Sequence, residues 1–179
     1  MKTALLVIDL QNDFTRDDGK VPACTAQMSD VIHTINAAIH HRNQDGELSA
    51  VVTTRWSNPL VRLLTKNSVK PGSFGAEIDA RLSQDIHPRF IKSSKDIFTS
   101  QELTQWLKEN QVEEVIFSGL ALEHCISVSV KAAISRNYRA SLLAGGLASY
   151  HCENREKYLL KLQQSGARVH EEHKAEQVQ

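Results

Sequence analysis

Residues 114–125 read Glu-Val-Ile-Phe-Ser-Gly-Leu-Ala-Leu-Glu-His-Cys and carry the strongest structural signal in the chain. The apolar run 115–117 is typical of a buried parallel strand, and residues 126–137 have the pattern of a helix. Cys125 therefore lies where a strand turns into a helix. The free N–H groups and the positive dipole end of a helix favour a thiolate at such a junction, which makes Cys125 a candidate nucleophile. The alternative is a small core residue, because free cysteines are commonly buried.

Charged residues end two further predicted strands. Asp9 follows the apolar run 4–8, and Lys92 ends the short strand 89–92. In open parallel sheets the ligand crevice lies outside the carboxyl ends of the strands, so side chains at these ends are placed to meet a substrate. If the three strands are parallel neighbours, Asp9, Lys92 and Cys125 would meet as a base, a cation and a nucleophile. Taken singly, Asp9 also suits a turn or a helix cap, and Lys92 a solvated strand end.

Predicted strands alternate with helical patterns along the chain. The strands are expected at residues 4–10, 49–54, 89–92, 114–118, 139–144 and 167–170. Helices are expected at residues 30–41, 126–137 and 154–165, and after a capping box formed by Thr99 and Glu102. This alternation is typical of an α/β fold with three layers, in which helices cover both faces of a mostly parallel, Rossmann-like, six-stranded sheet. The length of 179 residues suits a single domain, residues 1–179.

Composition argues against several classes of partner. Lysines plus arginines number 21, as do aspartates plus glutamates, so the chain lacks the charge excess expected for binding nucleic acid or an anionic membrane. No apolar stretch approaches transmembrane length and no signal-peptide pattern is present, which predicts a cytoplasmic protein. The three cysteines are too widely spaced for a disulfide framework or a Cys-x-x-Cys metal pair, so Cys24 and Cys152 are expected to be reduced.

At these residues the chain resembles the isochorismatase-like cysteine hydrolases, the superfamily that includes nicotinamidases and N-carbamoylsarcosine amidohydrolase. The matching pieces are the strand 6–9 followed by residues 11–14, then Lys92 with Phe98 six residues on, then the segment 119–125. Each motif alone is weak, but the ordered set covers most of the chain and is fairly specific. The resemblance implies the isochorismatase-like hydrolase fold.

The resemblance also implies roles for particular residues. Asp9, Lys92 and Cys125 would form the catalytic triad of the family, and the backbone N–H groups of Ala121 and Cys125 its oxyanion hole. A cis peptide would join Leu120 to Ala121. Cys125 would attack a carbonyl carbon, Asp9 would carry its proton to the leaving amine, and water would hydrolyse the thioester. Relatives commonly form dimers or tetramers, so a homodimer or homotetramer is expected.

The chain departs from nicotinamidases at their metal site. Those enzymes carry an Asp-x-His segment after the second strand, whereas residues 51–58 read Val-Val-Thr-Thr-Arg-Trp-Ser-Asn, without a carboxylate or an imidazole. The histidines elsewhere show no strong metal-binding spacing. We therefore expect no metal and no other cofactor, and the same departure argues against nicotinamide as the substrate. The expected partner is another small molecule with an amide or related C–N bond.

Residues 55–88 form a long segment without strong periodicity, as is common for loops that cover a binding site. Phe14, Trp56 and Phe98 are expected to form an apolar wall around a small planar amide, with ordinary core filling as the alternative. His124 is not expected to act as the base, because consecutive helix positions point about 100° apart and would turn it away from the Cys125 sulfur.

Two other functions stay open. The same fold could cleave a vinyl ether, as isochorismatases do, although the presence of Cys125 favours an amidase. A binding or scaffold protein could retain the fold without turnover. Folding does not require an acid, a lysine and a cysteine at strand ends, which argues against the scaffold, and function rests on the site rather than on the fold.

Overall fold

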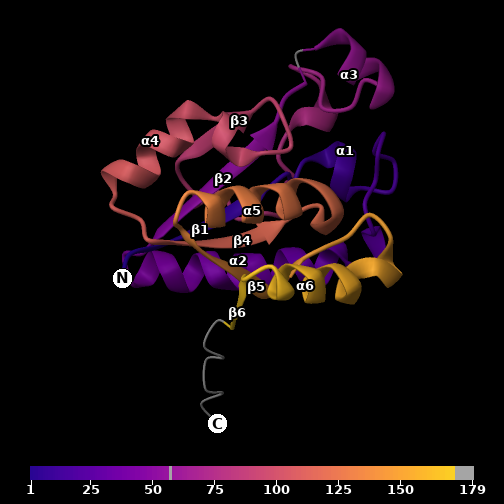
Figure 1. Ribbon diagram of the computed structural model, residues 1–179. Helices are drawn as coiled ribbons and strands as arrows, with labels where there is room; N and C mark the ends of the chain where they lie inside the picture. The colour runs from indigo at the N-terminus through magenta and orange to yellow at the C-terminus, as the bar shows by residue number, and fades with distance from the viewer. Residues whose placement is uncertain (57, 172–179) are drawn as a thin grey trace.

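The computed structural model describes residues 1–56 and 58–171, and its centre is a six-stranded sheet (Figure 1). The strands follow the order β3-β2-β1-β4-β5-β6, and each neighbouring pair is parallel. The strand bounds are β1 (Thr3–Ile8), β2 (Leu48–Thr54), β3 (Arg89–Lys92), β4 (Glu114–Gly119), β5 (Arg139–Leu147) and β6 (Arg168–His170). The predicted α/β class with a six-stranded sheet is confirmed, and each strand begins within one residue of its predicted start.

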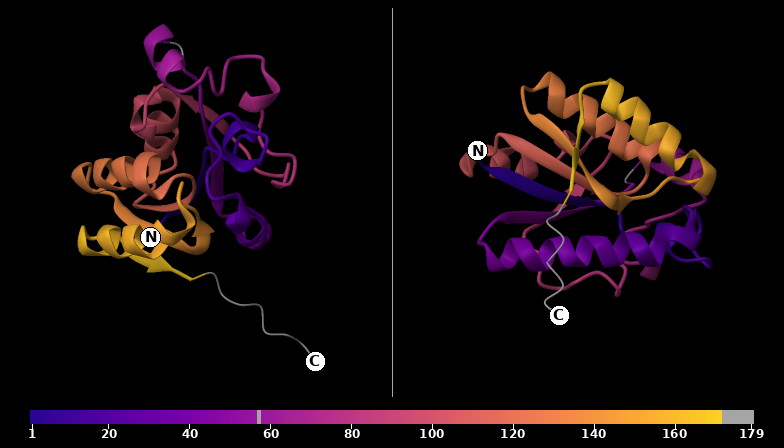
Figure 2. Two further views of the ribbon diagram at one scale, coloured as in Figure 1. Left: turned by 90° about the vertical axis from the view of Figure 1, so that its right-hand side faces the viewer. Right: turned by 90° about the horizontal axis from the view of Figure 1, so that it is seen from below.

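Helices connect the strands and cover both faces of the sheet (Figure 2). The longer helices are α2 (Met28–Gln44), α4 (Gln101–Glu109), α5 (Ser127–Ser135) and α6 (Arg155–Gln164). The short helices are α1 (Asn12–Thr15), α3 (Pro59–Leu64) and the π-helical turn η4 (Leu122–Ile126). Four 3-10 turns complete the set, namely η1 (Thr25–Gln27), η2 (Phe74–Ala76), η3 (Ile97–Thr99) and η5 (Cys152–Asn154).

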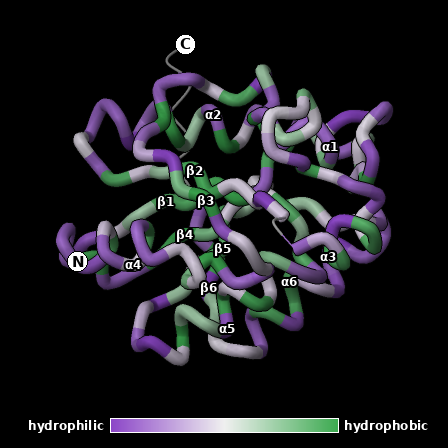
Figure 3. Tube along the Cα trace, turned by 90° about the horizontal axis from the view of Figure 1, so that it is seen from above, coloured by the Kyte–Doolittle hydropathy of each residue, from purple (hydrophilic) through white to green (hydrophobic). Residues whose placement is uncertain are grey.

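Two hydrophobic clusters fix these layers. Successive strand side chains point to opposite faces, so β1 sends Leu5 and Val7 toward α2 and sends Leu6 and Ile8 toward α4, α5 and α6. The apolar stripe of α2 packs on the first set; it consists of Met28, Val31, Ile32, Ile35, Ala38 and Ile39. Each of the methionine, valine and isoleucine side chains in this stripe contributes about 1.5–3 kcal/mol when it is fully buried. Figure 3 shows the hydrophobic segments gathered along the central strands.

The strand order creates a crevice between β1 and β4. The chain runs outward from β1 through β2 to β3 and then returns to pair β4 with the other edge of β1. Connections diverge at such a switch point and leave a space outside the carboxyl ends of the two strands. Gly119 ends β4 at this point with a φ of +99°, and a Cβ there would lie 2.0 Å from the Ile8 carbonyl oxygen. Glycine therefore lets β1 and β4 approach closely beside the crevice.

Three details differ from the sequence-based expectations. Cys24 and Cys152 form a disulfide with a Cα–Cα distance of 5.1 Å, so the prediction that both are reduced was wrong. The loop before η1 and the turn η5 meet only in the folded chain, and 128 residues of sequence separate the two cysteines. Helix α4 is capped by the Ser100 side chain and not by Thr99. The segment 55–88 is not structureless, because it contains α3 and η2.

Helix α3 stands out from the rest of the chain (Figure 1). Asn58 caps it, with the side-chain oxygen accepting a hydrogen bond from the Leu60 N–H at 2.9 Å. Leu60, Leu63 and Leu64 are all exposed, so α3 contributes little to the core. Among the described residues, no helix is long and apolar enough to cross a membrane.

Candidate active site

Three strand ends meet at the crevice between β1 and β4. Asp9 follows β1, Lys92 is the last residue of β3, and Cys125 lies six residues beyond β4. The Lys92 ammonium donates hydrogen bonds to the Asp9 carboxylate, with an Nζ–Oδ2 distance of 2.8 Å, and to Cys125, with an Nζ–Sγ distance of 3.3 Å. The structure thus brings together the three residues that the sequence predicted as base, cation and nucleophile.

Thr54, the last residue of β2, completes this cluster. Its hydroxyl donates to Asp9 Oδ1 at 2.8 Å and accepts a short hydrogen bond from Lys92 Nζ. Asp9 has a φ of 58°, a left-handed conformation that aspartate adopts more readily than most residues. Its N–H donates to the Val52 carbonyl at 2.9 Å. Both oxygens of the Asp9 carboxylate therefore accept hydrogen bonds, one from Thr54 at the end of β2 and the other from Lys92 at the end of β3.

Burial and the two opposite charges set the protonation of this cluster. Burial is the largest single influence on Lys92 and lowers its pKa, but the charges and hydrogen bonds of Asp9 and Cys125 together outweigh it, so the pKa is raised and the ammonium stays charged. Burial and the Asp9 charge raise the pKa of the Cys125 thiol to about 12, although Lys92 opposes them. At neutral pH the site therefore holds a thiol beside a carboxylate–ammonium pair, and the thiolate must form as a substrate reacts.

The turn after β4 presents the sulfur and a backbone donor. The peptide bond between Leu120 and Ala121 is cis, as the resemblance implied. Cys125 then lies in η4, where it is 9% exposed and faces the crevice. Within the described part of the chain, the Ala121 N–H has no hydrogen-bond partner. An unpaired N–H beside the sulfur is what stabilisation of a developing oxyanion requires.

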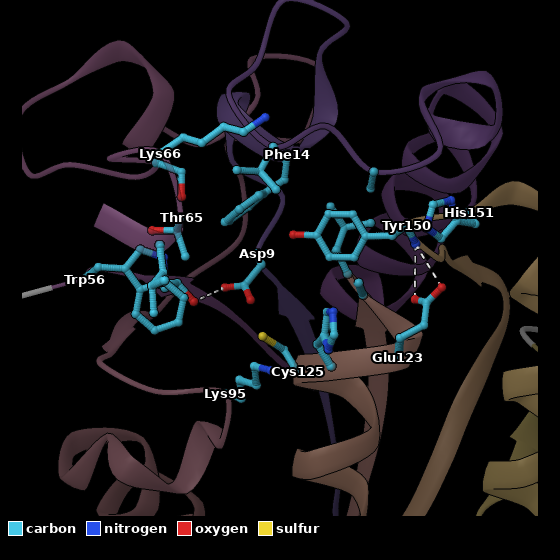
Figure 4. Close-up of a pocket in the computed structure, with 18 of the residues that line it drawn as sticks. Asp9, Phe14, Trp56, Thr65, Lys66, Lys95, Glu123, Cys125, Tyr150 and His151 are labelled. Atoms are coloured by element: carbon cyan, nitrogen blue, oxygen red, sulfur yellow. Dashed lines mark hydrogen bonds between the residues drawn. The ribbon is translucent and has the colours of Figure 1, made fainter. Parts of the chain in front are cut away.

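Cys125 and Asp9 face a cavity of about 580 Å³ (Figure 4). Phe14, Trp56 and Tyr150 supply aromatic surface to its walls, and the Tyr150 hydroxyl points toward Asp9. The structure thus brings Phe14 and Trp56 to the nucleophile, as the sequence predicted. Three flat side chains around one cavity suit a small planar ligand.

Phe98, the third predicted wall residue, is not among the residues that line this cavity. It packs in the core cluster on the face of the sheet opposite to Phe14 and Trp56, where its ring stacks on Tyr138 at a centroid distance of 5.7 Å. The Arg136 guanidinium lies 4.7 Å from its ring centre. The turn η3 follows β3 and carries Phe98 under α5, which the six-residue spacing from Lys92 could not reveal.

Residues 58–78, which we call the cover, close one side of the cavity. Leu64, Thr65, Lys66 and Ser68 of the cover line it. Two side chains next to β1 hold the cover in place. Gln11 donates to the Ala76 carbonyl at 2.8 Å and also to the Thr54 carbonyl at 3.1 Å. The expectation of a segment that shapes the pocket therefore applies to this part of residues 55–88.

Asp13 is the second anchor of the cover. Its buried carboxylate accepts hydrogen bonds from the Val69 N–H at 2.7 Å and from the Lys20 N–H at 3.2 Å. Gly75 passes so close that a Cβ there would lie 2.2 Å from the carboxylate. Lys66, Asn67 and Val69 have φ values of 52°, 55° and 44°, a left-handed run that these contacts hold in place. The cover is therefore tied to α1 by polar contacts.

His124 lines the cavity and does not point wholly away from it. Its ring packs edge-on against Tyr150 at a centroid distance of 5.4 Å. Burial and the charge of Lys95 lower the pKa of His124, so the imidazole is neutral at pH 7. Asp9 and Lys92, not His124, are the charged groups that act on the Cys125 sulfur.

A metal site would need several ligands at one place. In residues 1–56 and 58–171, no three histidine, cysteine, aspartate or glutamate side chains are grouped so that they could hold a metal ion. At the end of β2, Thr54 bonds to Asp9 and Trp56 lines the cavity, while Ser57 lies outside the described residues. The residues present at this position supply a hydroxyl and an indole, which are not typical metal ligands.

Sequence reasoning missed three residues of the site. Thr54 ends β2, so the rule that strand ends face the ligand could have found it. Lys95 and Tyr150 follow β3 and β5 by three residues each and line the cavity. Loops position both of them, and no pattern in the sequence marks them.

Known proteins match both the sequence and the fold. The family model for the isochorismatase domain matches residues 3–173. YddQ of Bacillus subtilis (strain 168), an uncharacterized isochorismatase family protein, is 25% identical over 150 residues, which cover 83% of this chain and 79% of that protein. The match to the family model extends across all the strands that build the site.

Solved structures share the arrangement of strands and helices. The nicotinamidase PncA from Bacillus subtilis superposes with a TM-score of 0.85 at 22% identity, covering 94% of this chain and 99% of the other. N-carbamoylsarcosine amidase from Thermoplasma acidophilum gives a TM-score of 0.81 at 22% identity, with 98% and 99% covered. At these identities the likeness concerns the fold.

Proposed function

This chain belongs to the isochorismatase family, and from that premise we propose that it is a metal-independent cysteine hydrolase that cleaves a small amide or related C–N bond. The observation that carries the proposal is the position of Lys92 Nζ. It lies 2.8 Å from Asp9 and 3.3 Å from Cys125, and these two partners line a cavity large enough for a small substrate. An acceptor for the proton, a cation and a nucleophile are therefore in contact before substrate binds.

The reaction begins with proton transfer from the Cys125 thiol to Asp9 as the sulfur attacks the carbonyl carbon. A C–S bond forms, and the carbonyl electron pair moves to oxygen, where the Ala121 N–H stabilises the negative charge. Lys92 stabilises the sulfur while its charge develops. Asp9 then returns the proton to the leaving nitrogen as the C–N bond breaks, which leaves a thioester on Cys125 and releases ammonia or an amine.

Water completes the cycle. Asp9, again a carboxylate, accepts a proton from a water molecule that attacks the thioester carbonyl. The C–S bond breaks, the sulfur recovers a proton, and the carboxylic acid product leaves. The oxyanion donor serves both halves of the reaction, and removal of one such donor typically costs about 3–4 kcal/mol of transition-state stabilisation.

Two considerations favour an amide over the vinyl ether of the alternative function. Two proteins of the same fold are named as a nicotinamidase and an N-carbamoylsarcosine amidase. Covalent attack also needs an electrophilic carbonyl carbon, and Cys125 faces the cavity with its proton acceptor already in place. The absence of carboxylate and imidazole groups from residues 51–58, at the end of β2, supports a reaction without metal and a substrate other than nicotinamide.

The test is a panel of primary amides, ureido acids and nicotinamide, assayed for ammonia release by the wild type and by Cys125→Ala. We expect release from at least one compound, complete loss in the variant, and an acyl adduct on Cys125 that mass spectrometry detects after rapid quenching. The melting temperature of Cys125→Ala serves as the control for folding. Ammonia release that survives the Cys125→Ala substitution would contradict covalent catalysis. Turnover of an enol ether without any amide would favour the alternative.

A further inference from the structure

We propose that Lys95 selects substrates that carry an anionic group, such as a carboxylate, a few bonds away from the amide that is cleaved. This inference rests on the proposed function, because it assigns the substrate class to the same cavity. Lys95 lines that cavity, and its side chain extends toward the Cys125 region in Figure 4.

The backbone at Lys95 is anchored while its side chain is exposed. The Lys95 carbonyl accepts a hydrogen bond from the Ser129 hydroxyl at 3.3 Å, and the same hydroxyl accepts one from the Ile97 N–H at 3.1 Å. Ser129 is buried in α5, so it fixes this loop to the core. The backbone of this loop is therefore fixed in place, and the Lys95 ammonium extends from it toward the cavity.

Within the part of the chain that the structure describes, no counter-ion pairs with the Lys95 ammonium. Among residues 1–56 and 58–171 it makes no hydrogen bond or ion pair. The two acids that line the same cavity, Asp9 and Glu123, and the neighbouring Asp96 are engaged with other groups. Asp9 pairs with Lys92, Asp96 caps the Phe98 N–H at 2.9 Å and faces Arg136 at 3.9 Å, and both oxygens of Glu123 accept from the Tyr150 N–H at 3.1 and 3.2 Å.

The position of Lys95 suits binding better than activation of the nucleophile. The charges that act on Cys125 are those of Asp9 and Lys92, whereas the charge of Lys95 acts on His124. Lys95 therefore acts on a cavity residue next to Cys125 and not on the sulfur itself, which suits contact with a part of the substrate other than the carbonyl under attack. A neutral substrate would partly desolvate this ammonium without compensation, but a carboxylate would pair with it.

Lys66 provides a matched control for the charge of Lys95. It is also an exposed lysine that lines the cavity, but it belongs to the cover and lies on the opposite side in Figure 4. A general positive field would depend on both lysines, whereas recognition of an anion beside the nucleophile depends on Lys95 alone. Comparison of the two variants therefore separates these explanations.

The experiment measures the alkylation rates of Cys125 by iodoacetate and by iodoacetamide at pH 9. Each reagent forms an S–C bond and releases iodide, and the two differ in one negative charge. Because both react with the same thiolate, the ratio of their rates cancels any change in thiolate population. Cys125 is the sole cysteine of the three outside the disulfide, so the label reports on this site. Ratios are normalised to free cysteine under the same conditions.

We expect the ratio of iodoacetate to iodoacetamide rates to fall about three- to fivefold in Lys95→Met, to stay near wild type in Lys95→Arg, and to change less than about 1.5-fold in Lys66→Met. Added salt should lower the wild-type ratio toward that of Lys95→Met. An unchanged ratio in Lys95→Met, or an equal fall in Lys66→Met, would overturn the assignment to Lys95.

A second measurement separates this inference from the proposed function. Succinate and the neutral succinamide are titrated by calorimetry into the whole protein, its Lys95→Met variant and its Lys66→Met variant. If succinate binds more tightly than succinamide and this preference disappears in Lys95→Met alone, the anion site is supported. This result would stand even if Cys125 resists both alkylating reagents, an outcome that would count only against the nucleophile. Equal binding of the two compounds by the wild type would reject the anion site, whatever the fate of the nucleophile.

Discussion

Substitution of Asp9 by asparagine should accelerate alkylation of Cys125 while it abolishes hydrolysis. In the resting site the Asp9 carboxylate disfavours the thiolate, because it is a nearby negative charge and a hydrogen-bond acceptor for the thiol. Asparagine removes the charge, has nearly the same shape, and also tolerates the left-handed backbone at this position, where φ is 58°. The variant loses the proton acceptor that turnover needs, so its two activities should change in opposite directions.

The size of the effect follows from the geometry. Asp9 Oδ2 and Cys125 Sγ lie 2.8 and 3.3 Å from the same Lys92 nitrogen. A unit charge about 4–6 Å from the sulfur, at an effective dielectric constant of about 20, is worth roughly 3–4 kcal/mol. That corresponds to about 2–3 pKa units, so the pKa of Cys125 should fall from about 12 to roughly 9–10. At pH 8 the thiolate population would rise about 100- to 1,000-fold, and the weaker nucleophilicity of a less basic thiolate reduces the gain in rate to about 10- to 30-fold.

The assay follows incorporation of iodoacetamide into Cys125 by mass spectrometry between pH 7 and 10. The wild-type rate should keep rising across this range, because the pKa lies above it. Lys92→Met is the control of opposite sign and should slow alkylation at every pH, since it removes the charge that favours the thiolate. Thermal melting checks that each variant is folded. Slower alkylation in Asp9→Asn would refute the reasoning, because it would mean that Asp9 already holds the proton of a resting thiolate.

Two further predictions concern the framework of the site. The double substitution Cys24→Ser with Cys152→Ser should lower the free energy of unfolding by about 2–5 kcal/mol in urea denaturation without reductant, and an unchanged midpoint would show that the disulfide does not stabilise the native chain. Gly119→Ala should lower it by about 3–5 kcal/mol, because its Cβ would meet the Ile8 carbonyl oxygen and its positive φ disfavours alanine. A Gly119→Ala variant as stable as the wild type in the same assay would contradict the close approach of β1 and β4.

The strand ends were predictable from the sequence because local patterns encode them. Short apolar runs fixed β1 and β4, and the polar residues that interrupt them mark the edge where the ligand crevice lies. Asp9 and Cys125 could therefore be selected without any knowledge of the loops. Lys92 ends a strand of four residues, where a solvated charge is equally common, and it was selected because it joins two other strand ends and matches the triad of the family that the chain resembles.

Other parts of the site depend on contacts between distant segments. Tyr150 and Lys95 reach the cavity through loops whose direction no periodicity specifies. Cys24 and Cys152 are 128 residues apart, and spacing rules for cysteines apply to neighbours in sequence rather than in space. Phe98 has the residue type of a pocket wall, but η3 places it in the core. The pKa of Cys125 also escaped prediction, because burial and the Asp9 charge outweigh the helix dipole that the sequence suggested.

Substitutions in the cover and substitutions at the strand ends should have different consequences for the site. Residues 58–67 rest on no strand, and α3 buries none of its side chains, so mutations there leave Asp9, Lys92 and Cys125 undisturbed. Gln11 and Asp13 hold the cover by hydrogen bonds to its C-terminal half, at Ala76 and Val69. A duplicated gene could therefore acquire a new substrate by altering these few residues while inheriting the reaction intact, and directed evolution aimed at specificity should begin with the same ten positions.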